Sequence, residues 1–401
     1  MDNCIVYIGD FDFRNENVQA HLVKNNGKIF NRLGFHVEYI GINRCVSSFR
    51  ELTAYTLNDG NGYLELPETL NTAGLLKIGK VCKTISDKLN EIKKSYNVSY
   101  VITYQSPTYA LAVKKIAVWC KKNGVKYIVN CADIPTFDLQ SPIRKTVMKA
   151  NWDYLHRINK KYADGVIAVS KYIRDFYSKP GRASTVLPPL FDSYETEPDF
   201  VSNNIASFVY AGIPFKITGK EANPEGMKDR LDKVIDLFLT LSENGTKYVF
   251  DIIGISKEDY LSGVPRHIKP LENETKIRFL GRHSHAETLK IVSNADFSIN
   301  YRDENLMTKA GFSTKIVESV SLGTPVIINS ISDTFDYLTP DSDGFILCGK
   351  TERDVEKLTR LCALSQSERL NIKRKLYEKK IFDTANYESN INSFFESLAN
   401  S

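Results

Sequence analysis

Residues 297–328 read FSINYRDENLMTKAGFSTKIVESVSLGTPVII. The stretch holds a short apolar run at 297–299, an amphipathic segment of helix length at 315–322, and a second apolar run at 325–328. A strand, a helix and another strand in this order are typical of a parallel sheet that is covered by helices. The stretch therefore predicts an α/β fold.

The same alternation extends in both directions along the chain. In the first half we predict strands at 5–8, 37–40, 100–103, 126–129, 166–169 and 185–187. In the second half we predict strands at 206–210, 248–253, 277–280, 297–299, 325–328 and 345–347, with helices near 227–242, 286–293 and 315–322. Two doubly wound, Rossmann-like domains account for this pattern.

Glycines mark the ends of several predicted helices. The first helix is predicted at 16–33 and stops at Gly34, and Gly124 and Gly245 end two later helices. Because glycine adopts the left-handed conformation without steric cost, all three positions suit helix C-caps.

A break in the alternation predicts the domain boundary. Residues 187–192 contain two prolines, and the polar stretch 193–204 follows them, as in an interdomain linker. A chain of 401 residues that is 42% hydrophobic is long and apolar enough for two cores. We expect one domain at 1–195, a second at 196–380, and a C-terminal helix within 381–401.

Composition excludes several classes of protein. The seven cysteines are scattered and form no C-x-x-C pair, which favours reduced thiols. We find no basic signal-peptide region and no run of the ~20 apolar residues that cross a bilayer, so we expect a cytosolic protein. Neither G-x-G-x-x-G nor G-x-x-x-x-G-K-[ST] occurs. His283 and His285 lack a third ligand nearby, so we assign no metal.

Charge is distributed unevenly along the chain. Division at residue 195 gives +9 for the first part and −4 for the second. The segment 143–162 is basic and amphipathic, and further lysines lie at 114, 115, 121, 122 and 126. An anionic membrane or a phosphorylated acceptor would suit this charge, although a solvated amphipathic helix is the favoured interpretation of 143–162 alone. Nucleic-acid binding is disfavoured, because no reading helix or stacking platform is evident.

The stretch 302–328 resembles the donor-site signature of family 4 glycosyltransferases (glycosyl transferases group 1), especially bacterial polysaccharide enzymes. In that family a glycine-containing loop opens a helix, a glutamate lies within the helix, and a G-T-P-V-I turn and strand follow. Here the loop is 310–314, the glutamate is Glu318, and the turn is 323–325. The resemblance implies the GT-B fold, with an acceptor domain at 1–195, a donor domain at 196–380 and a cleft between them. It also implies that the C-terminal helix within 381–401 packs back on the first domain.

Elementary chemistry supports a donor site in this segment. A helix N-terminus suits a diphosphate, and a carboxylate one turn further can accept hydrogen bonds from both ribose hydroxyls. Lys315 adds a cation on the same turn. The predicted donor-binding residues are Gly212, Arg302, Gly311, Phe312, Ser313, Thr314, Lys315 and Glu318.

Two further segments, 208–216 and 228–238, resemble the strand, glycine turn and lysine that hold the diphosphate in the family. A leaving diphosphate gains negative charge as the glycosidic bond breaks, so a nearby lysine stabilises the transition state most. We predict Lys228 as the first choice for this catalytic role and Lys216 as the second. Glu318 is the third residue that we predict to be catalytic. The segments 163–171 and 278–285 give supporting resemblance.

The chain departs from the family pattern at several positions. The usual first glutamate, eight residues before Glu318, is Ala310. The glycine pair of the first loop is replaced by 15–17, and the histidine of the acceptor cleft is missing. We nevertheless expect Gly9, Asp10, Gln105 and Ser106 to line the acceptor cleft, without a catalytic role.

The resemblance implies a retaining, metal-independent transfer of a sugar from a nucleotide diphosphate sugar, most simply a UDP-sugar, without another cofactor. The acceptor would be a saccharide or lipid-linked intermediate of surface polysaccharide synthesis, and the protein would be cytoplasmic or peripheral on the inner face of the membrane. Two alternatives remain open. One is a nucleotide-sugar epimerase of the same fold, and the other is a catalytically silent partner subunit that binds the nucleotide sugar.

Overall fold

The computed structural model describes residues 1–14, 18–43, 54–57, 59–67, 72–134, 142–192, 198–224 and 227–400. The chain divides into two compact units. Unit 1 comprises 1–190, 310–312 and 384–401, and unit 2 comprises 191–309 and 313–383. The chain first passes from unit 1 to unit 2 between Leu190 and Phe191, directly after the two prolines of the predicted linker.

Unit 1 is built on an eight-stranded sheet with the order β3-β4-β2-β1-β5-β6-β7-β8. Its strands are β1 (Asn3–Gly9), β2 (His36–Asn43), β3 (Ala54–Thr56), β4 (Gly62–Pro67), β5 (Asn97–Tyr104), β6 (Lys126–Cys131), β7 (Gly165–Ala168) and β8 (Ala183–Val186). Every neighbouring pair is parallel except β3 with β4. The sequence prediction missed β3 and β4. The edge strand β3 has only three residues, and its inner neighbour β4 contains Gly62, Glu65 and Pro67 and so lacks the continuous apolar run of the central strands.

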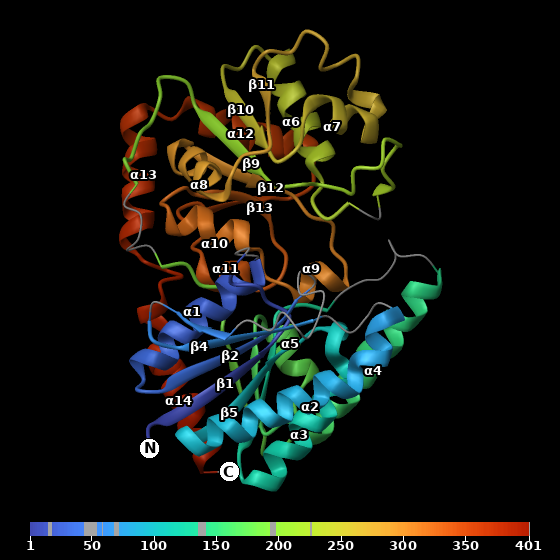
Figure 1. The fold of residues 1–401 in the computed structure, drawn as a ribbon. Coiled ribbons are helices and arrows are strands. Elements are labelled where there is room, and N and C mark those ends of the chain that lie inside the picture. The colour runs from blue at the N-terminus through green and yellow to red at the C-terminus, as the bar shows by residue number, and fades with distance from the viewer. Residues whose placement is uncertain are drawn as a thin grey trace. The chain divides into compact units, whose positions relative to one another are not determined.

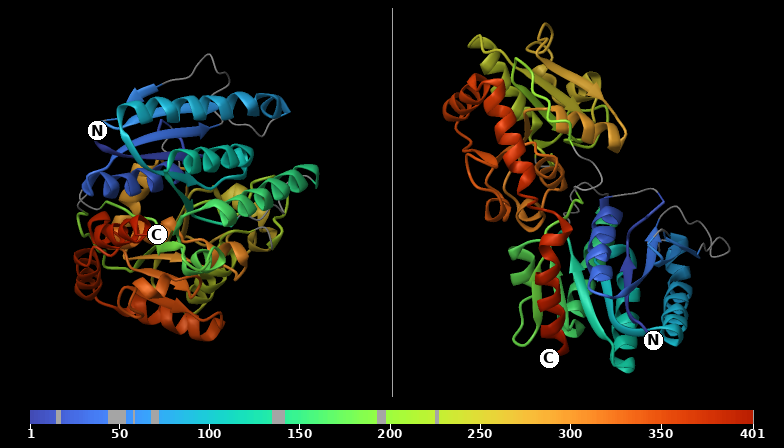
Figure 2. Two further views of the ribbon diagram at one scale, coloured as in Figure 1. Left: turned by 90° about the horizontal axis from the view of Figure 1, so that it is seen from below. Right: turned by 90° about the vertical axis from the view of Figure 1, so that its left-hand side faces the viewer.

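Helices cover both faces of this sheet (Figure 1, Figure 2). Helices α1 (Val18–Arg32) and α14 (Glu388–Ala399) pack on one face, where they share a core with the central strands. Helices α2 (Thr72–Ser95), α3 (Ala110–Asn123) and α4 (Pro142–Tyr162) lie side by side on the other face. The short helices η2 (Pro107–Tyr109) and α5 (Lys171–Phe176) follow β5 and β7.

The C-terminal helix α14 is part of the core of unit 1. The ring of Phe395 lies 4.6 Å from that of Tyr100, 5.3 Å from Phe35 and 5.6 Å from Phe30, measured between centroids. Burial of such a side chain contributes roughly 1.5–3 kcal/mol. The last residues of the chain therefore stabilise the unit that the first residues build.

Unit 2 has a six-stranded sheet, all parallel, with the order β11-β10-β9-β12-β13-β14. Its strands are β9 (Ser207–Ala211), β10 (Val249–Ile253), β11 (Ile277–Gly281), β12 (Phe297–Asn300), β13 (Val326–Asn329) and β14 (Gly344–Leu347). The predicted second-half strands are thus all present, and their sheet is parallel as predicted.

The helices of unit 2 also form two layers. One face carries α6 (Leu231–Glu243), α7 (Lys257–Gly263) with η5 (Pro265–His267), and α12 (Thr351–Ala363). The other carries α8 (His285–Asn294), α10 (Thr314–Ser321) and α13 (Gln366–Glu378). The remaining helices are α9 (Leu306–Ala310), α11 (Thr334–Tyr337) and η6 (Thr384–Tyr387), the last of which belongs to unit 1.

Two buried cations on α13 fix the start of unit 2. Arg369, only 2% exposed, places its Nε 3.2 Å from Oδ2 of the equally buried Asp296. The Lys373 ammonium donates to the carbonyls of Ser293 and Ala295 at 2.6 Å and of Val201 at 3.2 Å. Because these donors satisfy buried carbonyls, the polar residues after the linker have a defined path on unit 2.

The three predicted helix ends at glycines are confirmed, but the predicted start of one helix is wrong. Gly34, Gly124 and Gly245 have φ of +86°, +68° and +72°, as predicted for helix ends. Helix α6, however, begins at Leu231 rather than near 227, because the preceding residues form a loop that carries three charged side chains. In the part of the chain that the structure describes, none of the helices is both long and apolar enough to span a membrane.

Candidate active site

The switch point of the unit 2 sheet lies between β9 and β12, since the strand order reverses there. In doubly wound sheets, ligands bind beyond the carboxyl ends of the strands at such a point. Gly212 follows β9, Arg302 follows β12, and α10 begins at Thr314 on the same edge. The structure thus brings together four predicted donor residues, Gly212, Arg302, Thr314 and Lys315.

Gly212 makes room for Lys315. A Cβ atom at Gly212 would lie 2.1 Å from the Lys315 Nζ, and Gly212 has a φ of +149°. Lys315 also lies over the ring of Tyr210, with Nζ 4.7 Å from the ring centroid. The sequence analysis predicted a glycine turn at this place, and its structural reason is the close approach of a lysine from α10.

Asp229 organises the cations of this site, although the sequence analysis did not single it out. Its carboxylate is fully buried and pairs with Lys315 through Oδ2 and with Arg302 through Oδ1, the latter at 2.8 Å. The Tyr210 hydroxyl donates to Oδ2 at 2.9 Å. One buried anion therefore holds two cations at the switch point, which leaves a net positive charge there.

Asp229 remains ionised in this environment. Burial by itself would raise the pKa of the carboxyl, but the charges of Lys315 and Arg302 outweigh burial and hold the pKa below its ordinary 3.8. The carboxylate therefore positions both cations throughout the neutral range.

A second ion pair connects the same two loops as the pair of Asp229 with Arg302. Arg230, next to Asp229, pairs with Asp303, next to Arg302. Arg230 also binds Asp232 in a bidentate manner, at 2.9 and 2.8 Å. The two pairs fasten the loop before α6 to the loop after β12, and the backbone bond from Arg230 N to Tyr301 O, 2.7 Å, adds to them.

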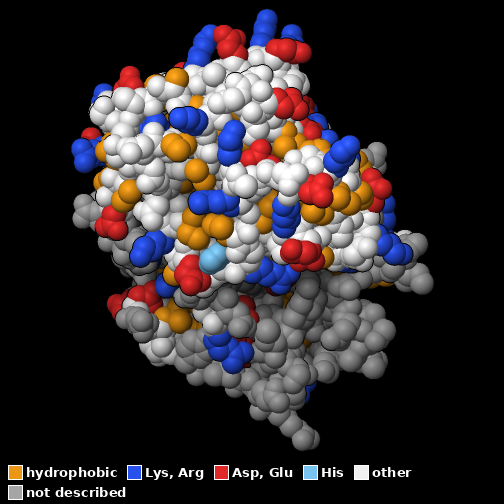
Figure 3. All heavy atoms as spheres, turned by 90° about the horizontal axis from the view of Figure 1, so that it is seen from above, with side chains coloured by type: hydrophobic (Ala, Val, Ile, Leu, Met, Phe, Trp, Pro, Cys, Tyr) orange, Lys and Arg blue, Asp and Glu red, His pale blue; other side chains and the backbone are white. Residues whose placement is uncertain are grey.

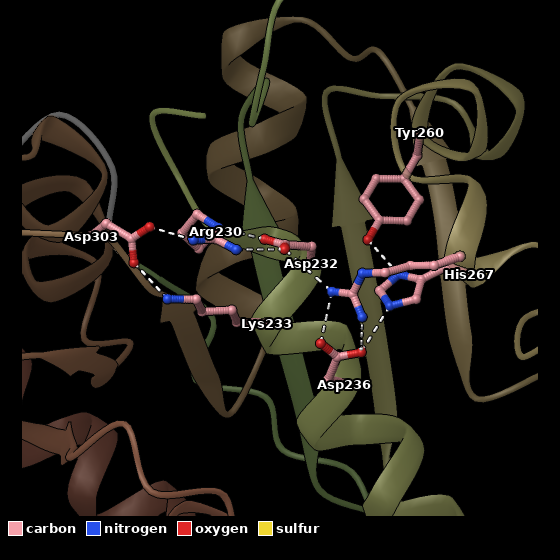
Figure 4. A network of polar contacts seen from close by, with 8 residues as sticks. Arg230, Asp232, Lys233, Asp236, Tyr260, His267 and Asp303 are labelled. Atoms are coloured by element: carbon pink, nitrogen blue, oxygen red, sulfur yellow. Dashed lines mark hydrogen bonds and ion pairs between the residues drawn. The ribbon is translucent and has the colours of Figure 1, made fainter. Parts of the chain in front are cut away.

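Figure 4 shows how this network continues along α6. Lys233 donates to Asp303 at 2.6 Å, and Arg266 bridges Asp232 and Asp236. The buried His267 lies between Asp236 and the Tyr260 hydroxyl, with distances of 2.8 and 2.7 Å. These contacts give the loop that carries Lys228 a rigid base.

Both predicted catalytic lysines lie at the surface of unit 2. Lys228 is exposed, and its backbone N–H donates to the Pro214 carbonyl at 3.0 Å, so the two loops that carry Lys216 and Lys228 are joined. Lys216 is exposed as well. The side chain of Lys228 is therefore exposed, whereas that of its neighbour Asp229 is buried.

Two buried polar side chains near the start of α10 have atoms that make no hydrogen bond to the described residues. Ser313 is the N-cap residue, yet its side chain makes no capping hydrogen bond. Within the described ranges, its buried hydroxyl has no partner, and neither amide atom of the buried Asn300 has one. Both residues lie at the carboxyl edge of the sheet, Ser313 before α10 and Asn300 at the end of β12. Sequence reasoning missed Asn300, because a single asparagine after a strand carries no motif.

Glu318 lies in the second turn of α10 and is 29% exposed. Its Oε1 lies 3.1 Å from Nε2 of His285, the first residue of α8. His283 instead lies 3.9 Å from Glu287. Where the structure describes the chain, no three His, Cys, Asp or Glu side chains come together as a metal-binding group.

Gly311 and Phe312 belong to a different unit from the other predicted donor residues. Residues 310–312 group with unit 1, whereas Ser313 and Thr314 group with unit 2. The Ser170 hydroxyl, which caps α5, donates to the Ala310 carbonyl at 2.6 Å. The structure therefore does not gather all predicted donor residues in one unit.

The predicted acceptor residues lie together at the switch point of unit 1, between β1 and β5. Gly9 pairs in register with Tyr104, and a Cβ atom at Gly9 would lie 2.6 Å from the Tyr104 Cβ. The Ser106 hydroxyl donates to Asp10 Oδ2 at 2.9 Å. A carboxylate and a hydroxyl in contact can bind the hydroxyl groups of a ligand. Residues 15–17, which the sequence analysis placed in this loop, lie outside the described residues.

Gln105 begins a buried polar chain behind these residues. Its Nε2 donates to the Tyr177 hydroxyl at 2.6 Å, and that hydroxyl contacts Nδ1 of His156. Burial, and then the charge of Lys160, lower the pKa of His156 to about 4, so the imidazole is neutral at pH 7. The chain of contacts fixes Gln105 against the helices of unit 1.

Solved structures with the same fold cover nearly the whole chain. They include HepE from Anabaena in complex with UDP (TM-score 0.65, 14% identity, 98% of this chain and 100% of that one). The lipopolysaccharide outer core galactosyltransferase WaaB matches with a TM-score of 0.61 at 15% identity, over 97% of this chain and 99% of that one. A glycosyltransferase from Rickettsia africae matches with a TM-score of 0.65 at 15% identity over all of both chains. The protein has the GT-B fold, as predicted.

Residues 227–379 match the family of glycosyl transferases group 1. This part of the chain is therefore similar to group 1 glycosyltransferases, which confirms the predicted resemblance. The match includes Lys228, Asp229, Arg302, Lys315 and Glu318. No curated protein matches the chain in sequence.

Proposed function

We propose that the protein transfers a glycosyl group from a nucleoside diphosphate sugar to an acceptor hydroxyl. One observation carries the proposal: Asp229 holds Arg302 and Lys315 as a net positive cluster at the N-terminus of α10, with Glu318 one turn further. The positive end of a helix and two cations suit a diphosphate, and a carboxylate one turn away suits a ribose.

UDP is the first nucleotide to test. HepE, which shares the fold, has been solved with UDP and with UDP-glucose. Shared fold does not fix the base, so UDP is a proposal for this chain and other nucleotides belong in the same experiment.

The transfer is proposed to retain the anomeric configuration and to need no metal ion. The acceptor oxygen attacks the anomeric carbon on the face from which the diphosphate leaves. The bond from this carbon to the diphosphate oxygen breaks, and the leaving phosphate takes the acceptor proton. Lys228, with Lys216 as the second choice, stabilises the charge that develops on the diphosphate. Glu318 holds the nucleoside during this step, and Gly311 and Phe312 complete the proposed donor loop.

The acceptor is proposed to bind at Gly9, Asp10, Gln105 and Ser106. A saccharide would suit the Asp10 and Ser106 pair, since its hydroxyls both donate and accept. A role in surface polysaccharide synthesis is supported by the similarity to WaaB, a lipopolysaccharide galactosyltransferase. It remains a proposal because it rests on fold and chemistry together.

Unit 1 is proposed to contact an anionic membrane surface through α3 and α4. Exposed lysines on α3 are Lys114, Lys115, Lys121 and Lys122, and this helix has no acidic residue. The exposed basic residues described on α4 are Lys145, Lys149, Arg157, Lys160 and Lys161, against the single acidic Asp153. By contrast, the face of unit 2 in Figure 3 mixes acidic and basic side chains.

The donor site is tested by thermal unfolding with a panel of nucleoside diphosphates in the absence of metal. We expect UDP or a related nucleotide to stabilise the protein, by about 2.7 kcal/mol at about 100 times Kd. Glu318→Ala should lose this stabilisation, because the ribose hydroxyls lose their acceptor. Glu272→Ala, at another exposed glutamate, is the matched control and should respond like the wild type. A panel without any response would contradict the proposal.

Turnover then separates an enzyme from a silent partner subunit, the alternative favoured by Ala310 at the place of the usual first glutamate. Release of UDP from UDP-glucose in the presence of saccharide acceptors would identify an enzyme. Tight binding without turnover across donors and acceptors would identify the silent subunit.

The membrane contact is tested by sedimentation with phosphatidylglycerol-containing vesicles. Each lysine near an anionic surface contributes about 1 kcal/mol to binding. The double variant Lys121→Gln and Lys122→Gln should therefore lower the partition coefficient by about tenfold or more. The control variant Lys24→Gln and Lys179→Gln removes two exposed lysines from other parts of unit 1 and should bind like the wild type. Equal losses in both variants would argue against a specific face.

A further inference from the structure

His285 contacts the residue that is proposed to bind the ribose. Its Nε2 lies 3.1 Å from Glu318 Oε1, and the two side chains are 49% and 29% exposed. The contact joins two helices, because His285 begins α8 and Glu318 lies in α10, which packs against α8. Both groups are therefore within reach of a ligand at this edge of the sheet.

His285 is not needed to form its own helix. Ser284 caps α8, and Ser284 and Glu287 form a complete capping box. The backbone of His285 is thereby fixed by its neighbours, and its imidazole is available for a contact outside α8. The contact of His285 with Glu318 is therefore not required for α8 to form.

The chemistry of the pair suits a supporting role. A carboxylate offers about four lone-pair positions, so one hydrogen bond from an imidazole leaves positions for the two vicinal hydroxyls of a ribose. A partly exposed glutamate otherwise loses rotamer freedom when it binds a ligand, which weakens binding. A hydrogen bond that already holds the carboxylate reduces this cost.

We propose that His285 is a positioning residue for nucleoside recognition. It donates from Nε2 to Glu318 and orients the carboxylate so that both ribose hydroxyls can bind to it. This inference rests on the proposed donor site. It adds a residue to the proposed donor site, and it predicts selectivity for ribose with both hydroxyls present.

The test compares UDP with 2′,3′-dideoxy-UDP, or the equivalent pair for the nucleoside diphosphate that stabilises the protein most. Calorimetry gives Kd for each, and the ratio of the two Kd values isolates the contribution of the hydroxyls. For the wild type we expect a ratio of about ten or more, since hydrogen bonds to a charged group are strong. Glu318→Ala should bring the ratio close to one.

The variants of His285 decide the inference. His285→Ala should lower the ratio about threefold to tenfold, as for the loss of one ordinary hydrogen bond. His285→Gln keeps an N–H donor and should restore most of the ratio. His283→Ala, two residues away and directed at Glu287, is the matched control and should leave the ratio unchanged.

The possible failures are distinguishable. If His285→Ala weakens both nucleotides equally, or changes neither, the ratio stays at the wild-type value and the positioning role is wrong. If Glu318→Ala itself leaves the ratio unchanged, the proposed ribose site is wrong, whatever His285 does.

Discussion

Replacement of Lys228 by methionine is expected to lower kcat by about 100-fold to 1,000-fold, with a much smaller change in KM for the donor. The leaving diphosphate gains charge in the transition state, so a cation beside it acts mainly there. Lys228 is exposed at the end of a loop that Asp229 and Arg230 fasten from within. Its loss should therefore affect catalysis and leave the free energy of unfolding nearly unchanged.

Two neighbouring lysines provide the comparison. Lys216→Met, in the loop joined to that of Lys228, should have a smaller effect on kcat, and Lys220→Met should have none, although both lysines are exposed. Steady-state kinetics with a metal chelator present gives all three values. A wild-type kcat in Lys228→Met would remove this lysine from the mechanism, and a large loss in Lys216→Met alone would transfer the role to that residue.

Asp229→Ala is expected to lower the free energy of unfolding by about 3–5 kcal/mol, since it leaves two partly buried cations without their anion. The carboxylate is fully buried, and Arg302 is only 14% exposed. Nucleotide binding should fall as well, because Lys315 and Arg302 lose the group that positions them. Urea unfolding, followed by calorimetry with UDP, measures both effects.

Asp251→Ala is the matched control. Asp251 also forms a bidentate pair with an arginine of the same unit, Arg278, but that arginine is 52% exposed. A surface pair of this kind contributes about 0–1 kcal/mol. If the two variants are equally stable, burial of the Asp229 pair has no special effect.

The effect of Asp229→Ala should also depend on pH. The folded-state pKa of Asp229 is held below its ordinary 3.8, so its stabilisation is complete above that pH and is lost as the pH falls towards the folded-state value. The difference between wild type and variant should thus shrink on acidification below about pH 4. A constant difference would show that the charge of the carboxylate is not what stabilises the site.

Local sequence patterns were enough to predict the two doubly wound sheets and the place of the donor segment. Buried parallel strands must be continuously apolar, and their helices must be amphipathic, so both patterns can be recognised locally. The stretch 302–328 could be linked to glycosyltransferases only through its resemblance to their donor-site signature, whose loop, glutamate and G-T-P-V-I turn lie close together in sequence. The strands β3 and β4 were missed because β3 is a very short edge strand and the inner strand β4 is interrupted by Gly62 and Glu65.

Which charges neutralise one another, and which remain for a ligand, became visible in the folded chain alone. Lys315 meets Asp229 from 86 residues away, and Arg302 meets it from 73 residues away. His285 meets Glu318 across 33 residues, and residues 310–312 group with unit 1. These contacts depend on strand order, which brings β9 next to β12 although other strands separate them in sequence. Periodicity is a local property of the chain, whereas the pairing of distant charges follows from how the sheet is assembled.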